Sequence, residues 1–368
     1  EPVTSTATAQ VEEETVPSIA VLPLADMSPQ GDNEYFSDGL TEELLNILAK
    51  IKDLKVAGRT SSFAFKGKNE DLREIAQKLD VNTILEGSVR KDDQRNRVRI
   101  TLQLINAEDG YHLWSETYDR DLDDIFTIQE EVANEVANAL KVTLLGEEEL
   151  TVEHVASTDL GAYDLYLRGL QGLNEFSYAS VQQAEQDFRQ SLELDPGYEP
   201  SQIGLVRSWQ MQANTGLITG SESINRGQPL LDTILERNPE NSQALILQAQ
   251  FHRQQRDFEI AEALYRQAIE IEPRNAIALN DLGGFLRDRE RIEEGMPYIR
   301  RAAQIEPYSA EFQNELCWSY LWLSALEDAL LACERMREIE PENPGGYYNT
   351  SLAYRVAGNL AQSTYWDT

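Results

Sequence analysis

The sequence predicts an α/β N-terminal domain with a mixed sheet, followed by an all-α superhelix of repeated helix–turn–helix units. Three observations lead to this fold class. Apolar strand-like runs alternate with amphipathic helical segments up to about residue 145. Farther along, Pro239, Pro273, Pro307 and Pro341 follow one another at intervals of 34 residues. Small residues recur at the same places within these intervals, and a constant period of about 20–50 residues is typical of repeat proteins.

The α/β domain is expected to span residues 17–145, between a polar, Thr-rich tether at 1–16 and an acidic linker at 146–160. Apolar runs and strict alternation predict strands over 18–24, 54–59, 83–90, 97–105 and 111–118. Helical periodicity predicts helices that begin at Ser37 or Asp38, at Asn69 and near Phe126, the last running to Leu145. The early strand–helix–strand connections favour a right-handed crossover, and the later strands read as a meander.

The second half of the chain is divided by its prolines. Segments such as Ile269-Glu-Ile-Glu-Pro273 end each unit, and an earlier Pro196 lies 43 residues before Pro239. Proline cannot continue a helix and sets the turn into the next unit. If each unit begins 31 residues before its proline, small residues fill its eighth and twentieth positions: Gly172, Ala249, Gly283 and Cys317, then Ala184, Ala261, Gly295 and Ala329. This pattern is typical of the tetratricopeptide (TPR) repeat, so residues 161–368 are predicted to form about five repeats, the last one truncated.

Five segments in fixed order carry a family resemblance. They are SIAVLP at 18–23, YFSDGLTEELL at 35–45, RTSSFAFKGK at 59–68, LEGSVR at 85–90 and HLWSETYDR at 112–120. Over nearly all of 18–140 the chain resembles the TolB amino-terminal-like domain family. The resemblance implies the sensory or scaffold end of a larger bacterial protein, such as a membrane-anchored winged-helix regulator of the CadC type, a class III adenylate cyclase or a kinase. It implies no catalytic residues, and the β-propeller of TolB itself does not follow here.

Composition narrows the function classes. The formal net charge is −32, spread over the whole chain, which argues against nucleic-acid binding because phosphates require clustered Lys and Arg. No apolar run approaches the ~18 residues of a membrane span, so a membrane association is expected only through an anchor upstream of Glu1. The chain begins without Met and stops within a repeat, as a fragment of something longer would.

Catalytic and metal-binding patterns are not found in the sequence. His112, His154 and His252 stand far apart and match no metal-ligand spacing, so no catalytic residue, metal or cofactor is predicted. The acidic run that begins at Asp119, with Glu130 at its twelfth position, resembles a calcium loop. Its sixth position is Asp124 instead of the required glycine, so a strand-to-helix junction is the preferred interpretation.

The two cysteines, Cys317 and Cys333, are expected on the two helices of one repeat. Free cysteine is a common buried residue, so two small core side chains are the favoured interpretation. A disulfide within the repeat is the alternative if the compartment is oxidising.

The first helices of stacked repeats line a concave groove, and their exposed positions are the predicted binding residues. These residues are Arg253, Asn280, Asp281, Arg287, Asn314, Trp318, Trp322, Tyr348, Asn349 and Arg355. Asn can hold an extended backbone, Arg a carboxylate, and Trp or Tyr an apolar anchor. Packing against neighbouring repeats is an equal alternative for the two tryptophans.

A basic hairpin stands out on this acidic chain. Its residues are Arg90, Lys91, Arg95, Arg97 and Arg99. A solvated outer face explains the alternation and is the favoured interpretation. The alternative is docking of an acidic partner, including the repeats of the same chain.

The sequence therefore favours a non-catalytic, protein- or peptide-binding sensory or scaffold region of a bacterial signalling protein, placed in the periplasm. One alternative is the regulatory half of a cytoplasmic enzyme such as a nucleotide cyclase. Others are a scaffold for envelope assembly and a small-molecule sensor in the α/β domain.

Overall fold

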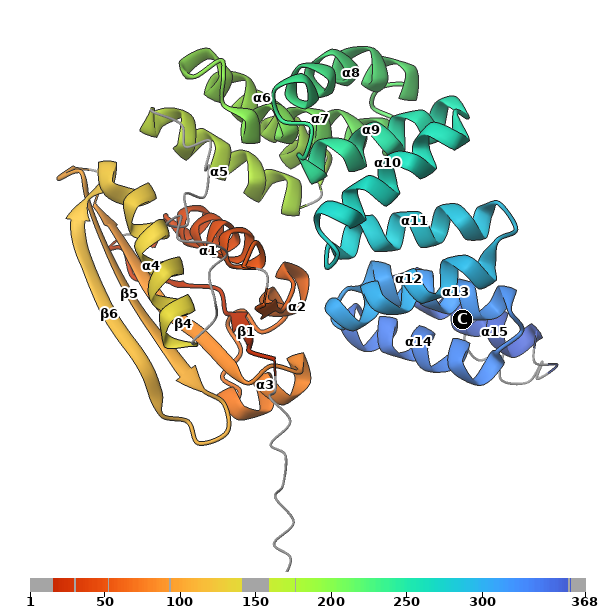
Figure 1. Ribbon diagram of the computed structural model, residues 1–368, viewed down its shortest axis with the longest axis horizontal. Coiled ribbons are helices and arrows are strands. Elements are labelled where there is room, and N and C mark those ends of the chain that lie inside the picture. Colours follow the sequence, from red (N-terminus) through yellow and green to blue (C-terminus); the bar gives the residue numbers. More distant parts are fainter. Residues whose placement is uncertain are drawn as a thin grey trace, which may run out of the picture.

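A computed structural model describes residues 16–29, 31–51, 53–92, 94–140, 159–175, 177–356 and 358. The predicted fold class is confirmed, because a mixed α/β domain is followed by a superhelix of paired helices (Figure 1). Residues 1–15 of the predicted tether and 146–158 of the predicted acidic linker lie outside the described residues. None of the described helices combines the length and hydropathy that crossing a bilayer demands.

The sheet joins a parallel part to an antiparallel meander. Its strands are β1 (Ser18–Val21), β2 (Ala25–Asp26), β3 (Lys55–Val56), β4 (Thr83–Asp92), β5 (Arg97–Asn106) and β6 (His112–Asp121). Their order is β3-β1-β4-β5-β6, with β2 also on β4. β1 runs parallel to β3 and β4, whereas β4, β5 and β6 are antiparallel neighbours. The crossover and the meander expected from the sequence are both present.

Helices cover both faces of the sheet. They are α1 (Glu34–Ala49), α2 (Arg59–Phe63), α3 (Leu72–Leu79) and α4 (Ile125–Ala139), the last preceded by the short 3-10 turn η1 (Leu122–Asp124). The inward side chains of β5, Val98, Ile100, Leu102 and Leu104, share one buried cluster with α1 and α4. The opposite face packs against α3 through Ile75 and Leu79.

Several element boundaries differ from the predictions. β1 ends at Val21 instead of residue 24, and α4 ends at Ala139, while residues 141–145 of the helix predicted to reach Leu145 lie outside the described residues. α1 begins after Asn33, earlier than Ser37, and the side chain that caps α3 is Asp71 in place of Asn69. The predicted strand over 54–59 is only Lys55–Val56, and Arg59 starts the short helix α2. The first turn of α2 is held by a residue of the repeats, so local propensity alone could not reveal it.

The repeats form five helix pairs and a further single helix within the described residues. The pairs are α5 (Leu160–Glu175) with α6 (Tyr178–Leu194), α7 (Glu199–Asn214) with α8 (Gly220–Arg237), α9 (Ser242–Gln255) with α10 (Phe258–Ile271), α11 (Ala276–Asp288) with α12 (Ile292–Ile305), and α13 (Ala310–Trp322) with α14 (Leu326–Ile339), followed by α15 (Pro344–Val356). The longer helices α7 and α8 account for the interval of 43 residues before Pro239.

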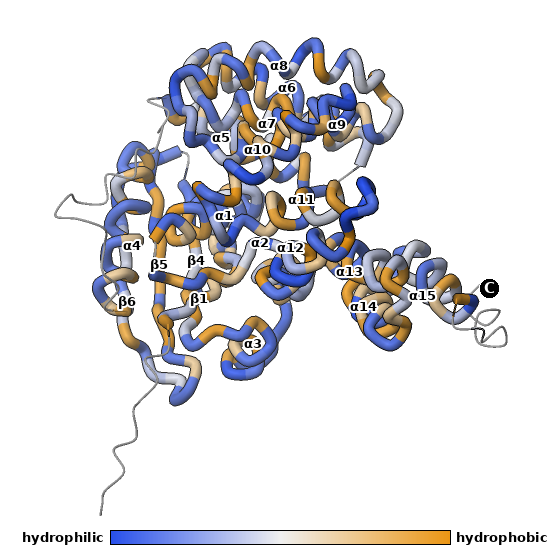
Figure 2. Tube along the Cα trace, turned by 45° about the vertical axis from the view of Figure 1, so that its right-hand side comes forward, coloured by the Kyte–Doolittle hydropathy of each residue, from blue (hydrophilic) through white to orange (hydrophobic). Residues whose placement is uncertain are grey.

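The two halves of the chain share one apolar core. A single buried cluster runs from the sheet through α1 into α5, α6 and α7, and includes Leu40, Leu44, Tyr163, Leu167 and Phe188. Both views place α5 over α1 and α2 beside α12, and apolar residues follow β5 in the interior (Figure 2). The α/β domain is therefore packed against the superhelix and is not merely tethered to it.

Paired helices approach closely where the sequence places small residues. A Cβ atom added to Gly283 of α11 would lie 2.3 Å from Ile299 Cγ1 and 3.1 Å from the backbone oxygen of Gly295 in α12. One added to Gly284 would meet only the carboxylate end of the Glu315 side chain, at 3.1 Å. The two adjacent glycines therefore have different structural roles, because the close packing of α11 against α12 requires glycine only at position 283.

We expect Gly283→Ala to lower the free energy of unfolding by about 1–2 kcal/mol, because overpacking outweighs the gain in helix propensity. Gly284→Ala is the matched control and should leave stability unchanged or raise it by up to ~1 kcal/mol. Chemical denaturation followed by circular dichroism measures both. Equal effects at the two positions would contradict the close approach of α11 and α12.

Candidate binding face and domain junction

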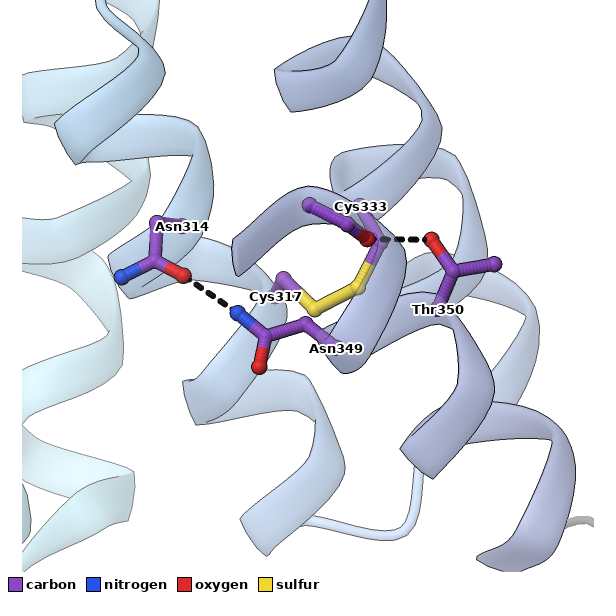
Figure 3. Close-up of a disulfide and its surroundings, with 6 residues drawn as sticks. Asn314, Cys317, Cys333, Asn349 and Thr350 are labelled. Carbon is purple, nitrogen blue, oxygen red and sulfur yellow. Dashed lines mark hydrogen bonds between the residues drawn. A yellow bond between two sulfur atoms is a disulfide. The ribbon is translucent and has the colours of Figure 1, made fainter. Parts of the chain in front are cut away.

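The first helices of successive repeats form a continuous surface, here called the first-helix face. Gln250 of α9 donates a hydrogen bond of 2.7 Å to Oδ2 of Asp281 on α11. Asn349 of α15 donates one of 2.5 Å to Oδ1 of Asn314 on α13 (Figure 3). Because an ion pair of Arg287 with Glu315 also joins α11 to α13, the first helices from α9 to α15 present one connected polar surface.

Two arginines of this face, Arg253 and Arg287, already have anionic partners. Arg253 Nη2 lies 2.6 Å from Oδ2 of Asp288, and Arg287 pairs with both Asp288 and Glu315. The sequence reasoning assigned arginine to a ligand carboxylate. In the structure, ion pairs of Arg253 and Arg287 also tie α9, α11 and α13 together.

Two carboxyl groups of the face have pKa values above their usual range. Burial raises the pKa of Asp281 to about 6, and the charges of Glu311 and Glu315 add to that rise against the hydrogen bond from Gln250 and the attraction of Arg253. Burial and the neighbouring Glu315 likewise raise the pKa of Glu311. The middle of the first-helix face is therefore a place where negative charge is poorly compensated.

The other predicted residues of the face differ in exposure. Trp322 and Tyr348 are large and open to solvent, at 57% and 61% exposure, whereas Trp318 is half-buried. Asn280 is only 7% exposed, and its Oδ1 atom receives no hydrogen bond within the described part of the chain. Arg355 is exposed at the end of α15. The binding role of all ten residues stays a prediction.

The two cysteines form a disulfide, in contrast to the favoured interpretation of two reduced core residues. Cys317 of α13 and Cys333 of α14 are fully buried, with their Cα atoms 5.4 Å apart (Figure 3). That spacing lies within the range that a disulfide spans. The physical reason is the repeat itself, because Cys317 and Cys333 hold the positions at which Gly283 and Ile299 face each other in the preceding repeat.

The basic hairpin is correctly placed on β4 and β5 but is not a free basic surface. Arg97 and Arg99 both pair with Asp119 of β6, Arg97 also with Asp121, and Arg95 pairs with Asp92. The exposed Arg90 donates to the backbone oxygen of Met27. Asp119 and Asp121, the first residues of the run that resembles a calcium loop, lie on the strand β6, where Arg97 and Arg99 pair with them.

Lys91 corrects the interpretation of the hairpin as a solvated outer face. Its side chain is 4% exposed, and its Nζ lies 2.7 Å from Oδ1 of Asp164 on α5 and 3.0 Å from the hydroxyl of Tyr35. Burial opposes the charge, but the hydrogen bonds to Asp164 and Tyr35 raise the pKa of Lys91 above its ordinary value. For this residue the alternative interpretation, docking against the repeats, is what the structure shows.

A second junction was missed by sequence reasoning. Glu306, in the turn between α12 and α13, accepts hydrogen bonds from the backbone N–H groups of Ser61 at 2.8 Å and Thr60 at 3.3 Å. These groups belong to the first turn of α2, whose N–H groups have no partner within the helix. A Cβ atom on Gly58 would lie 2.0 Å from Oε1 of Glu306, so the approach requires glycine there.

The sequence held a signal for this junction. The residues equivalent to Glu306 in the neighbouring repeats, Glu272 and Glu340, accept hydrogen bonds from Asn275 and Asn343, three positions later. Ser309 stands at that place after Glu306 and caps α13 instead. Without the asparagine amide, the carboxylate of Glu306 is available to α2.

An open cleft of about 360 Å³ lies between α1, α2 and α5. Its charged residues are mostly paired with each other: Arg59 Nε lies 2.7 Å from Oε2 of Glu42, and Lys66 Nζ lies 2.6 Å from Oδ2 of Asp38. These pairs join α1 to the segment that contains α2. A role as a small-molecule site is not required to explain them.

The comparisons with known proteins agree with the fold. A model of the tetratricopeptide repeat family matches residues 221–270 and 246–310. The second half of the chain therefore contains tetratricopeptide repeats, a class of fold that mediates protein–protein interaction.

One relative also overlaps the chain. The putative adenylate cyclase 3 of Rhizobium meliloti (strain 1021) is 43% identical over 189 residues, which cover 51% of this chain and 32% of that protein. The match thus spans about a third of the relative's own length.

Solved structures with similar arrangement are more distant. PilF of Pseudomonas aeruginosa is 14% identical, with a TM-score of 0.43, over 56% of this chain and 88% of its own. TTC0263, a thermophilic TPR protein of Thermus thermophilus, is 18% identical with a TM-score of 0.41, over 53% of this chain and 99% of its own. YrrB, described as a TPR protein with an unusual peptide-binding site, is 17% identical with a TM-score of 0.37, over 49% of this chain and 88% of its own.

We expect Glu306→Ala to lower the free energy of unfolding by about 1–3 kcal/mol, because the buried N–H group of Ser61 and the partly buried one of Thr60 lose their acceptor. Amide hydrogen exchange at Thr60 and Ser61 should accelerate, which separates loss of this contact from a general weakening. Glu340→Ala is the matched control, since it removes the equivalent carboxylate from an exposed turn. Unchanged exchange at Thr60 and Ser61 would contradict the junction.

Proposed function

We propose that this chain is the protein-binding region of a larger bacterial signalling protein, and that its first-helix face holds an extended segment of a partner. The observation that carries this proposal is the continuous polar surface of α9, α11, α13 and α15, with Trp322 and Tyr348 exposed beside it. Exposed aromatic side chains are frequent binding anchors, because they bury a large area with little loss of side-chain freedom.

The α/β domain has a place in the same proposal. Segments that resemble the TolB amino-terminal-like family also make the contacts with the repeats. In α1, Gly39 packs against Leu167 and Tyr35 donates to Asp164, and the α2 segment supplies Ser61 to Glu306. These contacts support an α/β domain that acts as a docking platform and relays a binding event from the repeats.

The output of the signal would lie outside this chain. The relative named a putative adenylate cyclase favours a nucleotide cyclase as the output, with this chain as its non-catalytic regulatory part. A winged-helix regulator of the CadC type is the other output that the TolB-like resemblance implies. A scaffold for envelope assembly would bind its partner constitutively, without any output.

We propose the periplasm as the compartment, supported by the Cys317–Cys333 disulfide, since disulfides persist in oxidising compartments. The alternative is the cytoplasm, where glutathione keeps thiols reduced. In intact bacteria we expect the two thiols to resist a maleimide reagent after acid quenching and denaturation, and to react only after reduction. Reaction without reduction would favour the cytoplasm.

Site-specific photo-crosslinking tests the binding face. A photoreactive amino acid at Trp322, in the full-length protein in its native cells, should form a defined adduct with one partner. The same amino acid at Leu331, an equally exposed position on the second helix α14, is the matched control. Tyr348→Ala should then weaken binding of the identified partner by roughly 10-fold or more. Equal crosslinking at both positions would place binding elsewhere.

A further inference from the structure

The middle of the first-helix face has more anions than cations. Asp281, Asp288, Glu311 and Glu315 lie on α11 and α13, and the cations next to them are Arg253 and Arg287. Both arginines already form ion pairs, Arg253 with Asp288 and Arg287 with Asp288 and Glu315. Within the described residues no ion pair involves Asp281 or Glu311, although each lies close enough to Glu315 to be affected by its charge.

A buried acceptor without a donor lies on the same face. Asn280 and Asn314 hold the same position in consecutive repeats, 34 residues apart. Asn314 Oδ1 receives its hydrogen bond from Asn349, on the next first helix (Figure 3). The residue 35 positions after Asn280 is Glu315, which has no N–H group in its side chain. Asn280 Oδ1 is therefore buried and, among the described residues, unpaired, and such a group costs free energy unless a donor reaches it.

We propose that the first-helix face between α11 and α13 binds an extended, basic segment of a partner protein. A Lys or Arg side chain of that segment lies between Asp281 and Glu311, and one of its N–H groups donates to Oδ1 of Asn280. This inference rests on the proposed function and adds the chemistry of the partner.

The charges decide between a basic and an acidic segment. An acidic segment would find Arg253 and Arg287 already paired, and would bring its carboxylates next to Asp281 and Glu311. A cation enters a site where Asp281 and Glu311 form no ion pair with the described residues, and where the burial of Asp281 strengthens the attraction. The unpaired Asn280 further favours a ligand with N–H donors, which both a peptide backbone and a basic side chain provide.

The binding should depend on pH with a defined sign. The pKa of Asp281 is about 6 without ligand, and a bound cation stabilises the ionised carboxylate. Affinity should therefore increase as the pH rises through about 6 and decrease below it. The groups that face Asp281 are Gln250 and Arg253 on α9, Tyr265 on α10, and Glu311 and Glu315 on α13. Of these, Glu311 also has a raised pKa and acts in the same direction.

The test uses the whole chain and three labelled synthetic peptides of one length. The peptides share their leucine positions, and their variable positions are all Lys, all Gln or all Glu. In fluorescence anisotropy at neutral pH, the Lys peptide should bind at least about tenfold more tightly than the other two. Asp281→Asn with Glu311→Gln should remove that preference and the pH dependence, and Glu311→Lys, which places a cation at the same position, should also remove the preference.

The control variant carries the same change in net charge on the second helices. Glu270→Gln with Glu293→Gln alters exposed residues of α10 and α12, so binding of the Lys peptide should stay within about twofold of the parent chain. Equal weakening in both double variants would show attraction to overall charge only, and would overturn the proposal.

Asn280→Leu separates binding from folding. Removal of an unpaired buried oxygen should leave the thermal midpoint unchanged or higher, while the Lys peptide binds several-fold more weakly. Spermine that binds as tightly as the peptide, with no effect of Asn280→Leu, would overturn the peptide part of the proposal. If the Lys peptide does not bind, or the Gln peptide binds equally well, the inference is wrong. If the Gln peptide binds equally well and Trp322→Ala weakens its binding, the inference about a basic partner is wrong but the proposed function still holds.

Discussion

The packing of α5 against α1 is the contact on which the arrangement of the whole chain depends. Tyr163, Tyr166 and Leu167 of α5 are buried in the same core as the sheet, and each such side chain contributes roughly 1.5–3 kcal/mol when fully buried. The hydroxyl of Tyr166 also donates to Glu43 of α1. Because α5 begins the repeats, its position sets the direction in which all later helices are stacked.

Repeat proteins have contacts mainly between neighbours, so a superhelix held at one end can change its curvature easily. Here a second attachment exists, because Glu306 binds α2 in the turn between α12 and α13. Tyr308 reinforces it by packing edge-on against Phe65, with ring centroids 5.1 Å apart. The repeats between α5 and α12 are therefore held at both ends by one domain. A ligand that alters the spacing of α11 and α13 acts next to the second attachment, which gives the proposed relay a physical route.

The sequence was sufficient where a pattern is local or periodic. Alternation predicted β5, and the small residues at Gly283 and Gly295 predicted the close approach of α11 and α12. It was insufficient where the partner is distant in the chain. The alternating sequence predicted Lys91 as part of the exposed basic hairpin, because its partner Asp164 lies far away in the chain. The short helix α2 and the role of Glu306 depend on each other across more than two hundred residues, so neither local propensity nor the repeat period could show them.

The chemistry of the first-helix face follows the same division. Periodicity identified which residues lie on it, but charge compensation depends on which pairs form between repeats. Arg287 on α11 reaches Glu315 on α13, and Arg253 on α9 reaches Asp288 on α11. Each arginine therefore neutralises a carboxylate of the following repeat, and the face is left negative at Asp281. The charges with which a repeat surface selects a partner are those that its internal ion pairs leave uncompensated.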